Sequence, residues 1–402
     1  MVVCPKSVLT NWQQEAERFT PQLVMIDLEA CDDRLAAIKA AGPNDVVVLS
    51  YGLVTRLADA LNEVEWNCAV LDEAQQIKNP QAKRSKVVFG LQAAHRFALS
   101  GTPVENHLVE LWSLFSFLNP GLLGDLKSFR SKYSQAAKQQ QDMLRLKALV
   151  SPFIMRRTKK EVLTELPAKT EVVHHVELSN KERTAYEAVR KESLANLKSA
   201  SSRGVVEVFA ALTKLRQICC DVSLVFDSMQ GEASTKLTEA QSLIEEALDG
   251  DHKVLVFSQF VGVLKRFSAQ LTESNISFSY LDGKLSTKQR QAAIDTFKDG
   301  TNSVFLISLK AGGTGLNLTE ADTVIHIDPW WNPAVEDQAS DRAYRMGQQK
   351  PVTVYRLVTK DTIEEKIIAL HHDKRDLADQ VLSATSSSKA LDPQQLLGLL
   401  EG

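Results

Sequence analysis

The sequence has no long hydrophobic run, few cysteines and no large excess of charge of either sign. Across 402 residues no apolar run approaches the roughly 20 residues of a membrane span. The longest candidates, such as residues 304–307, have the length of a strand. The first six residues have neither the length nor the layout of a secretion signal. We therefore predict a cytoplasmic protein without a membrane span.

The cysteine content argues against a disulfide framework and against a zinc site. The five cysteines are odd in number, and no two of them have the CxxC spacing. They are Cys4, Cys31, Cys68, Cys219 and Cys220. For the adjacent pair, residues 219–220, we predict two small buried side chains on a helix rather than a redox switch.

The net charge of −3 provides no general basic field for nucleic acid. Any contact with DNA would need a local basic surface. The chain is 44% hydrophobic and 24% charged, which is typical of a globular protein, and its length suggests two or three domains.

Strand-like and helix-like stretches alternate at both ends of the chain. Buried strands are predicted at residues 46–49, 68–71 and 97–99, and again at 253–257, 276–280, 304–307, 323–327 and 352–358. Alternation of this kind favours parallel α/β sheets that are covered on both faces. The stretch between the two regions looks mostly helical, with one strand at 171–178.

The predicted division therefore has four parts, and the predicted fold class is α/β. They are a partial lobe at residues 1–105, a helical insertion and linker at 106–240, a second lobe at 241–366, and a helical tail at 367–402.

Two adjacent carboxylates, Asp72 and Glu73, follow the predicted strand at 68–71. Ligands of open α/β sheets bind at the carboxyl ends of strands, where one carboxylate can hold Mg²⁺ and its neighbour can orient a water. About 25 residues later, Ser100, Gly101 and Thr102 follow another strand and allow close approach of the backbone. The alternatives are a plain acidic turn and an ordinary Gly-Thr-Pro turn.

A glycine-rich stretch at residues 308–318 follows a buried strand and includes Gly313, Thr314 and Gly315. Its backbone N–H groups could bind phosphate oxygens. The alternative is a flexible glycine loop.

A helix is predicted within residues 328–348, beginning at the N-cap residue Asn332. On it Gln338, Arg342 and Arg345 have the spacing i, i+4 and i+7, which places them on one face. Two guanidinium groups on one face can bind the γ-phosphate of a nucleotide. The alternative is a set of surface ion pairs with neighbouring aspartates.

Taken in order, these strings resemble the motifs of Swi2/Snf2-type DNA translocase ATPases, a group within helicase superfamily 2. The strings and the motifs that they resemble are residues 4–7 with Asn11, Trp12 and Glu15 (motif Ia), 72–75 (motif II), 100–103 (motif III), 254–260 (motif IV), 308–318 (motif V) and 328–348 (motif VI). Residues 153–159 and 215–220 look like parts of the group's helical insertion, although Asp221-Val222 stands where the group has His-Pro. A compact bacterial-type member is favoured, and such a protein would be associated with the nucleoid.

The resemblance implies two RecA-like parallel-sheet lobes that bind ATP and Mg²⁺ and move along double-stranded DNA without separating its strands. Remodelling of a DNA-bound complex such as RNA polymerase would follow. The implied catalytic residues are Asp72, Glu73, Arg342 and Arg345, with Asp72 also holding Mg²⁺ through the nucleotide. The implied nucleotide-binding residues are Gln75, Gly313, Gly315 and Gln338. The implied coupling residues are Ser100, Gly101 and Thr102.

The implied DNA contacts are mainly to phosphates and therefore independent of sequence. They are Lys6, Ser7, Ser258, Gln259, Lys310 and Thr314. Trp330 and Trp331 could face the DNA or the cleft, or could pack in the core. Residues 156–160 (RRTKK) could contact DNA or the cleft, or could form a solvated helix end.

One expected element, a GxGKT-type phosphate loop, does not occur in the sequence. We therefore expect an incomplete first lobe and a chain that is a fragment of a longer protein. Should the short chain be natural, we expect a non-catalytic DNA- or partner-binding module with very weak ATP hydrolysis. The helical insertion argues against a third possibility, a strand-separating helicase.

Overall fold

The computed structural model describes residues 1–101, 108–134, 140–157, 159–163, 165–199, 205–312 and 316–371. These residues form two compact units, of which the first ends at Met155 and the second begins at Arg156. The boundary falls within the predicted insertion at 106–240, and the four-part division stays a prediction. Most of the predicted helical tail lies outside the described residues.

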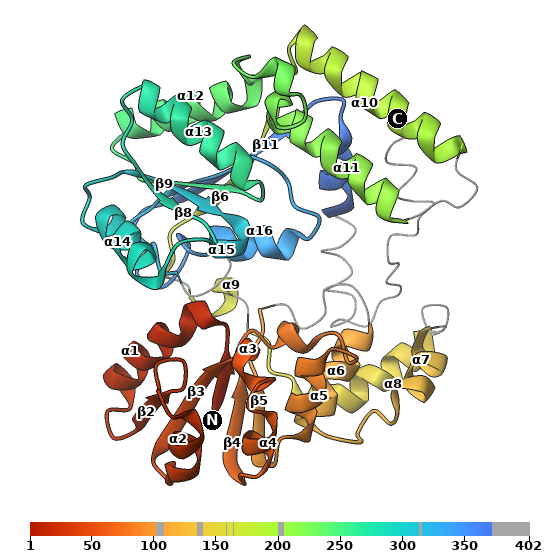
Figure 1. Ribbon diagram of the computed structural model, residues 1–402, viewed down its shortest axis with the longest axis vertical. Helices are drawn as coiled ribbons and strands as arrows, with labels where there is room; N and C mark the ends of the chain where they lie inside the picture. Colours follow the sequence, from red (N-terminus) through yellow and green to blue (C-terminus); the bar gives the residue numbers. More distant parts are fainter. Residues whose placement is uncertain are drawn as a thin grey trace. The chain divides into compact units, whose positions relative to one another are not determined.

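The first unit contains a parallel five-stranded sheet with the order β2-β3-β1-β4-β5 (Figure 1). Its strands are β1 Val2–Cys4, β2 Val24–Asp27, β3 Asp45–Ser50, β4 Trp66–Leu71 and β5 Ala93–Ala98. Its helices are α1 Leu9–Phe19, α2 Arg34–Ala40, α3 Tyr51–Val54, α4 Ala58–Asn62, α5 Lys83–Gly90, α6 Leu108–Leu118, α7 Leu126–Ser134 and α8 Gln140–Val150.

Both faces of the central strands are buried. In β1, Val2 and Cys4 pack with Leu9 of α1, whereas Val3 packs into the larger cluster on the other face. Side chains alternate between the faces of a strand, so three consecutive apolar residues in β1 serve both clusters.

Strand β5 has one neighbour among the described strands, β4. The predicted buried strand at residues 97–99 is wrong in its limits and its burial, because β5 ends at Ala98 and the side chains of Phe97 and Leu99 are 55% and 46% exposed. The side chains of a strand at the edge of a sheet have fewer neighbours to cover them than those of a central strand.

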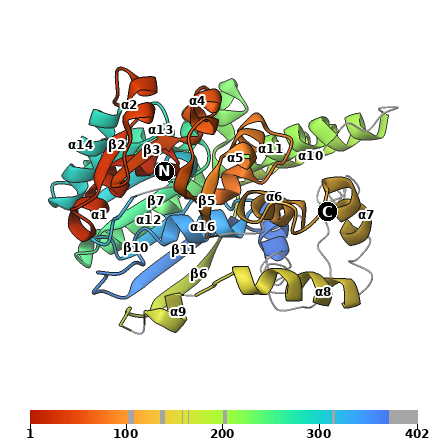
Figure 2. The ribbon, with the colours of Figure 1, turned by 90° about the horizontal axis from the view of Figure 1, so that it is seen from below.

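Helices α6, α7 and α8 of the first unit lie next to one another (Figure 2), and their apolar side chains form a separate cluster. Its buried members include Phe115 of α6, Phe129 of α7 and Leu146 of α8. The predicted helical character after the first sheet is confirmed for these residues.

The second unit contains a parallel six-stranded sheet with the order β6-β11-β10-β7-β9-β8. Its strands are β6 Lys169–Val176, β7 Val254–Ser258, β8 Phe278–Leu281, β9 Val304–Ser308, β10 Thr323–His326 and β11 Val352–Thr359. Its helices are α9 Lys159–Val162, α10 Asn180–Ser199, α11 Val205–Cys220, α12 Thr235–Asp249, α13 Val261–Glu273, α14 Thr287–Lys298, α15 Leu309–Gly312 and α16 Pro333–Ser340.

Helices cover both faces of this second sheet. Figure 1 shows α12 and α13 on one side of it and α14 to α16 on the other. Within β7, the side chains of Val254 and Val256 pack in the apolar cluster under α12 and α13. Those of Leu255 and Phe257 pack in the cluster under α14 to α16. The predicted fold class, two parallel-sheet α/β lobes, is confirmed.

Three smaller expectations can also be compared with the structure. The strand predicted at 171–178 is β6, and it joins the second sheet beside β11 rather than standing within a helical stretch. Cys219 and Cys220 are buried on α11, as predicted, and burial raises the pKa of both thiols. No helix in the described part of the chain is long and apolar enough to cross a membrane.

Candidate functional site

The predicted site residues of the first unit gather at one edge of its sheet. Asp72 and Glu73 follow β4, Ser100 follows β5, and Lys6 follows β1. Because all strands of the sheet are parallel, their carboxyl ends lie at the same edge. Residues separated by almost a hundred positions are thereby brought together.

The carboxylate of Asp72 is oriented by two donors. The indole Nε1 of Trp12 donates to Oδ2 at 2.9 Å, and the backbone N–H of Glu73 donates to Oδ1 at 2.9 Å. The hydroxyl of Tyr51 donates to the Asp72 carbonyl oxygen at 2.8 Å. A carboxylate oxygen can accept two hydrogen bonds, and each oxygen of Asp72 accepts one of those from Trp12 and Glu73, so both keep capacity for a further ligand. This fits Mg²⁺ held by one carboxylate and a nucleotide.

A chain of side-chain hydrogen bonds joins the two strand ends. Glu73 has left-handed backbone angles (φ 51°, ψ 51°), which cost a non-glycine residue on the order of 1 kcal/mol. Its Oε2 accepts from Gln75 Nε2 at 2.6 Å, and Gln75 Oε1 accepts from the Ser100 hydroxyl at 2.8 Å. Gly101 is exposed, and Thr102 lies outside the described residues.

The predicted DNA contacts of this unit, Lys6 and Ser7, follow β1 at the same edge of the sheet. Lys6 is 70% exposed, and its Nζ lies 3.5 Å from Glu29 Oε2. Ser7 is half-buried. Glu29 also accepts from the Ser50 hydroxyl at 2.5 Å.

In the second unit, Arg342 and Arg345 converge on one backbone carbonyl. Their Nη1 atoms donate to Leu316 O at 3.4 Å and 3.3 Å. Arg342 is 6% exposed, whereas Arg345 is exposed. Leu316 directly follows Gly313 and Gly315, which are predicted to bind the nucleotide, and Thr314, which is predicted to contact DNA. These three residues lie outside the described residues.

The helix predicted to carry both arginines is shorter than expected. Asn332 is its N-cap as predicted, because its side chain accepts from Ala334 N, but α16 ends at Ser340. The expectation of one helix face is therefore wrong. Gln338 lies half-buried on the helix, and the two arginines follow it in a chain of turns.

An arginine also holds the residue before the glycine-rich segment. Arg290 of α14 donates from Nη1 to Ala311 O at 3.1 Å, and the Ser308 hydroxyl accepts from Ala311 N at 3.3 Å. Lys310, a predicted DNA contact, is exposed beside them. Arginines thus bind the chain on both sides of the segment, and the sequence reasoning did not assign this role to Arg290.

Ser258 and Gln259 lie against a buried carboxylate at the end of β10. The Ser258 hydroxyl donates to Asp328 Oδ1 at 2.6 Å, and Gln259 N donates to the same oxygen at 3.2 Å. Ser258 is fully buried, so its hydroxyl would have to leave Asp328 before it could bind DNA. Its predicted DNA contact, like that of Gln259, stays a prediction.

The other oxygen of Asp328 pairs with Arg216 of α11, whose Nη2 lies 3.2 Å away. Burial raises the pKa of Asp328, and the charge of Arg216 opposes this shift. The guanidinium carbon of Arg216 lies 5.6 Å and 5.5 Å from the ring centroids of Trp330 and Trp331. This geometry favours the interpretation of the two tryptophans as packing residues.

A second buried arginine connects α16 to two strands. Arg356 of β11 contacts Glu336 at 2.9 Å, Glu171 of β6 at 2.7 Å and Asp337 at 3.2 Å. Burial raises the pKa of Glu336 to about 7, against the hydrogen bond from Trp330 N and the charge of Arg356. These ion pairs hold α16, the helix that precedes the segment with Arg342 and Arg345, which we call the arginine turn (residues 341–348).

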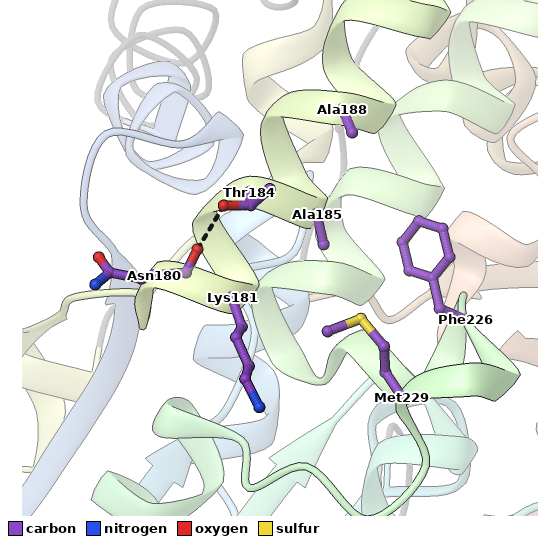
Figure 3. Close-up of a pocket in the computed structure, with 7 residues that line it drawn as sticks. All are labelled: Asn180, Lys181, Thr184, Ala185, Ala188, Phe226 and Met229. Atoms are coloured by element: carbon purple, nitrogen blue, oxygen red, sulfur yellow. Dashed lines mark hydrogen bonds between the residues drawn. The ribbon is translucent and has the colours of Figure 1, made fainter.

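The second unit also has a cavity of about 510 Å³ away from these motifs in sequence (Figure 3). It lies between the first turns of α10 and the segment with Phe226 and Met229, and Ala185 and Ala188 face it. None of the predicted site residues lines it. Among the described residues, no cluster of three or more His, Cys, Asp or Glu side chains could hold a metal ion.

Comparison with known families agrees with the motif order. Residues 1–224 match the SNF2-related domain, and residues 235–347 match the helicase conserved C-terminal domain. The chain belongs to the SNF2 family.

Individual relatives in the family cover almost all of this chain. It is 37% identical to the putative ATP-dependent helicase/translocase YwqA of Bacillus subtilis, over 98% of this chain and 44% of YwqA. It is 32% identical to the TATA-binding protein-associated factor MOT1 of Saccharomyces cerevisiae, over 100% of this chain and 25% of MOT1. The chain thus spans less than half the length of these relatives.

Among solved structures, the Sulfolobus solfataricus SWI2/SNF2 ATPase core in complex with dsDNA is 38% identical to this chain. The match covers 95% of this chain and 82% of that one, with a TM-score of 0.46.

Proposed function

We propose that the chain is part of a motor that hydrolyses ATP with Mg²⁺ and moves along double-stranded DNA, where it remodels bound protein complexes. The main support is the hydrogen-bond chain from Glu73 through Gln75 to Ser100, beside a doubly oriented Asp72. It connects a carboxylate pair suited to phosphate chemistry with the end of the next strand. Membership of the SNF2 family supports the same function.

In this proposal each charged residue has a defined role. Asp72 holds Mg²⁺ together with the nucleotide, and Glu73 orients the attacking water. Arg342 and Arg345 stabilise the charge that develops on the transferred phosphate, as guanidinium groups do in other phosphoryl-transfer enzymes. Gln75 passes a change at the nucleotide to Ser100.

The proposed DNA contacts are exposed cations at the carboxyl edges of the two sheets, Lys6 and Lys310. Binding through phosphates would be independent of sequence and would weaken as salt rises. One relative is named a TATA-binding protein-associated factor, which supports a DNA-bound protein complex as the target. RNA polymerase stays a predicted target of the same kind.

The test uses the intact motor of which this chain is part, since the chain itself has no GxGKT-type phosphate loop, and compares its wild type with Glu73→Gln in ATP hydrolysis, with and without duplex DNA. We expect stimulation by DNA in the wild type, and a fall in kcat of about 100-fold or more in the variant, because an activating carboxylate is lost. The matched control is Glu63→Gln, a carboxylate that is exposed and lies outside the motifs. Displacement of a triplex-forming strand from the duplex measures translocation.

Three results would contradict the proposal. Duplex binding without any hydrolysis would indicate the non-catalytic binding module. Robust strand separation would indicate a helicase that unwinds DNA. Equal activity of the wild type and Glu73→Gln would show that the carboxylate after β4 is not catalytic.

A further inference from the structure

Lys159 binds the turn that carries the two predicted arginines. Its Nζ lies 2.9 Å from Asp341 Oδ2 and donates to Tyr344 O at 2.7 Å. Asp341 directly precedes Arg342, and Tyr344 directly precedes Arg345. A single ammonium group therefore restrains the chain just before each arginine.

The sequence offered two interpretations of residues 156–160, a contact with DNA or the cleft and a solvated helix end, and neither names the turn at 341–344 as the partner of Lys159. The Lys159 side chain is only 36% exposed, and its ammonium also lies 5.9 Å from the centre of the Tyr344 ring. Two of its three N–H donors have partners in the turn. The partners are more than 180 positions away in sequence, so no local pattern indicates them.

Lys159 lies close to the point in the chain where the second unit begins. Lys159 begins α9 and follows Met155, the last residue of the first unit, by four positions. The first residues of the second unit therefore contact the arginine turn directly, through the side chain of Lys159. This contact does not involve a strand of the sheet.

The turn has need of such a restraint, because α16 ends at Ser340 and the arginines lie beyond its regular hydrogen bonds. Groups that act on a transition state must be held to within about 0.5 Å by their supporting contacts. Arg342 and Arg345 share Leu316 O as a partner, and Lys159 holds the backbone from the other direction.

We propose that Lys159 is a positioning residue for Arg342 and Arg345 that connects the start of the second unit to their placement. This inference rests on the proposed ATP hydrolysis. Lys159 itself touches neither nucleotide nor DNA in this proposal. Its charge is compensated by Asp341, which leaves the two arginines as the cations directed to the phosphate.

The experiment compares Lys159→Met, Lys159→Arg and the matched control Lys169→Met in DNA-stimulated ATP hydrolysis. Lys169 lies 6.0 Å from the same Tyr344 ring but pairs with Glu171 at 2.8 Å. We expect Lys159→Met to lower kcat about 10-fold with the KM for ATP unchanged, since misplaced groups lose transition-state stabilisation. Lys159→Arg should recover kcat to within about 3-fold, and Lys169→Met should stay within about 2-fold of the wild type.

Hydrogen–deuterium exchange of residues 341–348, without nucleotide or DNA, is the second measurement. Lys159→Met should increase exchange in this peptide, and Lys169→Met should leave it unchanged. The Lys159–Asp341 pair is partly exposed, so little of the folding stability depends on it and Tm should change little. A loss of kcat at constant Tm would then reflect position and not unfolding.

Each remaining result would overturn the inference. Lys159→Met could leave both kcat and exchange unchanged, or Lys169→Met could have the same effects as Lys159→Met. A weaker salt dependence of duplex affinity in Lys159→Met would instead identify Lys159 as a phosphate contact. If the wild type hydrolyses no ATP, the proposed function fails, and the exchange of residues 341–348 alone decides the role of Lys159.

Discussion

Removal of the Arg216 guanidinium is the most informative single change in the second unit. Arg216 is 2% exposed and pairs with Asp328, which is fully buried and also accepts from Ser258. Arg216→Met keeps an apolar stem of similar length and deletes the charge. The carboxylate of Asp328 would then remain in a low-dielectric environment without its ion-pair partner.

The expected loss of stability follows from the distance and the burial. Unit charges 3.2 Å apart attract by about 5 kcal/mol at an effective dielectric constant of about 20. Removing one partner of a buried pair typically costs about 3–5 kcal/mol, since the other charge stays buried. We therefore expect Arg216→Met to lower the free energy of unfolding by about 3–5 kcal/mol, which is about 10 °C in Tm for a domain of this size.

The assay is a double-mutant cycle measured by urea unfolding at pH 7. Asp328→Asn keeps the side-chain oxygen that accepts from Ser258 and Gln259 but removes the charge. The double variant of Arg216→Met and Asp328→Asn has no isolated charge and should be more stable than Arg216→Met alone. We expect a coupling energy of about 2 kcal/mol or more between the two positions.

An exposed ion pair provides the control. Lys181 lies 2.6 Å from Glu232, and the two side chains are 67% and 42% exposed, so Lys181→Met should cost less than about 1 kcal/mol. If the losses from Arg216→Met and Asp328→Asn simply add, Arg216 does not compensate the buried carboxylate. The inference that the Arg216–Asp328 pair holds the end of β7 and the segment after β10 in place would then be wrong.

Three further predictions concern pH, the metal site and DNA. Burial, aided by the charge of Arg356, lowers the pKa of His326 to about 3. The unfolded chain therefore binds the proton first, stability is lost as the pH falls below about 6.5, and a shift from pH 7 to 5 should cost about 2 kcal/mol through this residue. Urea unfolding of His326→Gln should lack that contribution, and an unchanged pH dependence would contradict it. Trp12→Phe removes the N–H donor to Asp72 and should raise the Mg²⁺ concentration needed for half-maximal ATP hydrolysis several-fold, whereas an equal requirement would mean that Trp12 does not orient the carboxylate. Lys310→Ala should reduce the slope of log affinity for duplex DNA against log salt by about 1, and an unchanged slope would exclude a phosphate contact.

The strands that are buried on both faces were predicted most reliably from the sequence. The central strands β7, β9 and β10 are covered on both faces, so they appear as continuous apolar runs, and each lies within a residue or two of its predicted limits. The strands β1 and β2 were not identified. One has three residues, and the other is partly exposed, so neither carries a strong local signal.

Contacts between distant residues could not be predicted in the same way. The spacing of Gln338, Arg342 and Arg345 fits a continuous helix, and no proline or glycine in that interval signals its end. In the structure, Lys159 binds Tyr344 O, and the two arginines bind Leu316 O, so tertiary contacts stabilise a turn instead. Local spacing states which residues could share a face, and the tertiary partners decide whether they do.

Two buried ion pairs of the second unit, Arg216–Asp328 and Arg356–Glu336, are better explained by the segments that they hold in place than by a gain in folding stability. A buried ion pair often contributes no more than apolar residues of the same volume would. In both pairs, however, the carboxylate also accepts a hydrogen bond from a site segment. Asp328 binds Arg216 through one oxygen and Ser258 through the other, and Glu336 binds Arg356 while accepting from the backbone just after β10. We infer that these pairs fix motif segments from distant parts of the chain in one arrangement, which apolar side chains could not do, because they provide no directional contact.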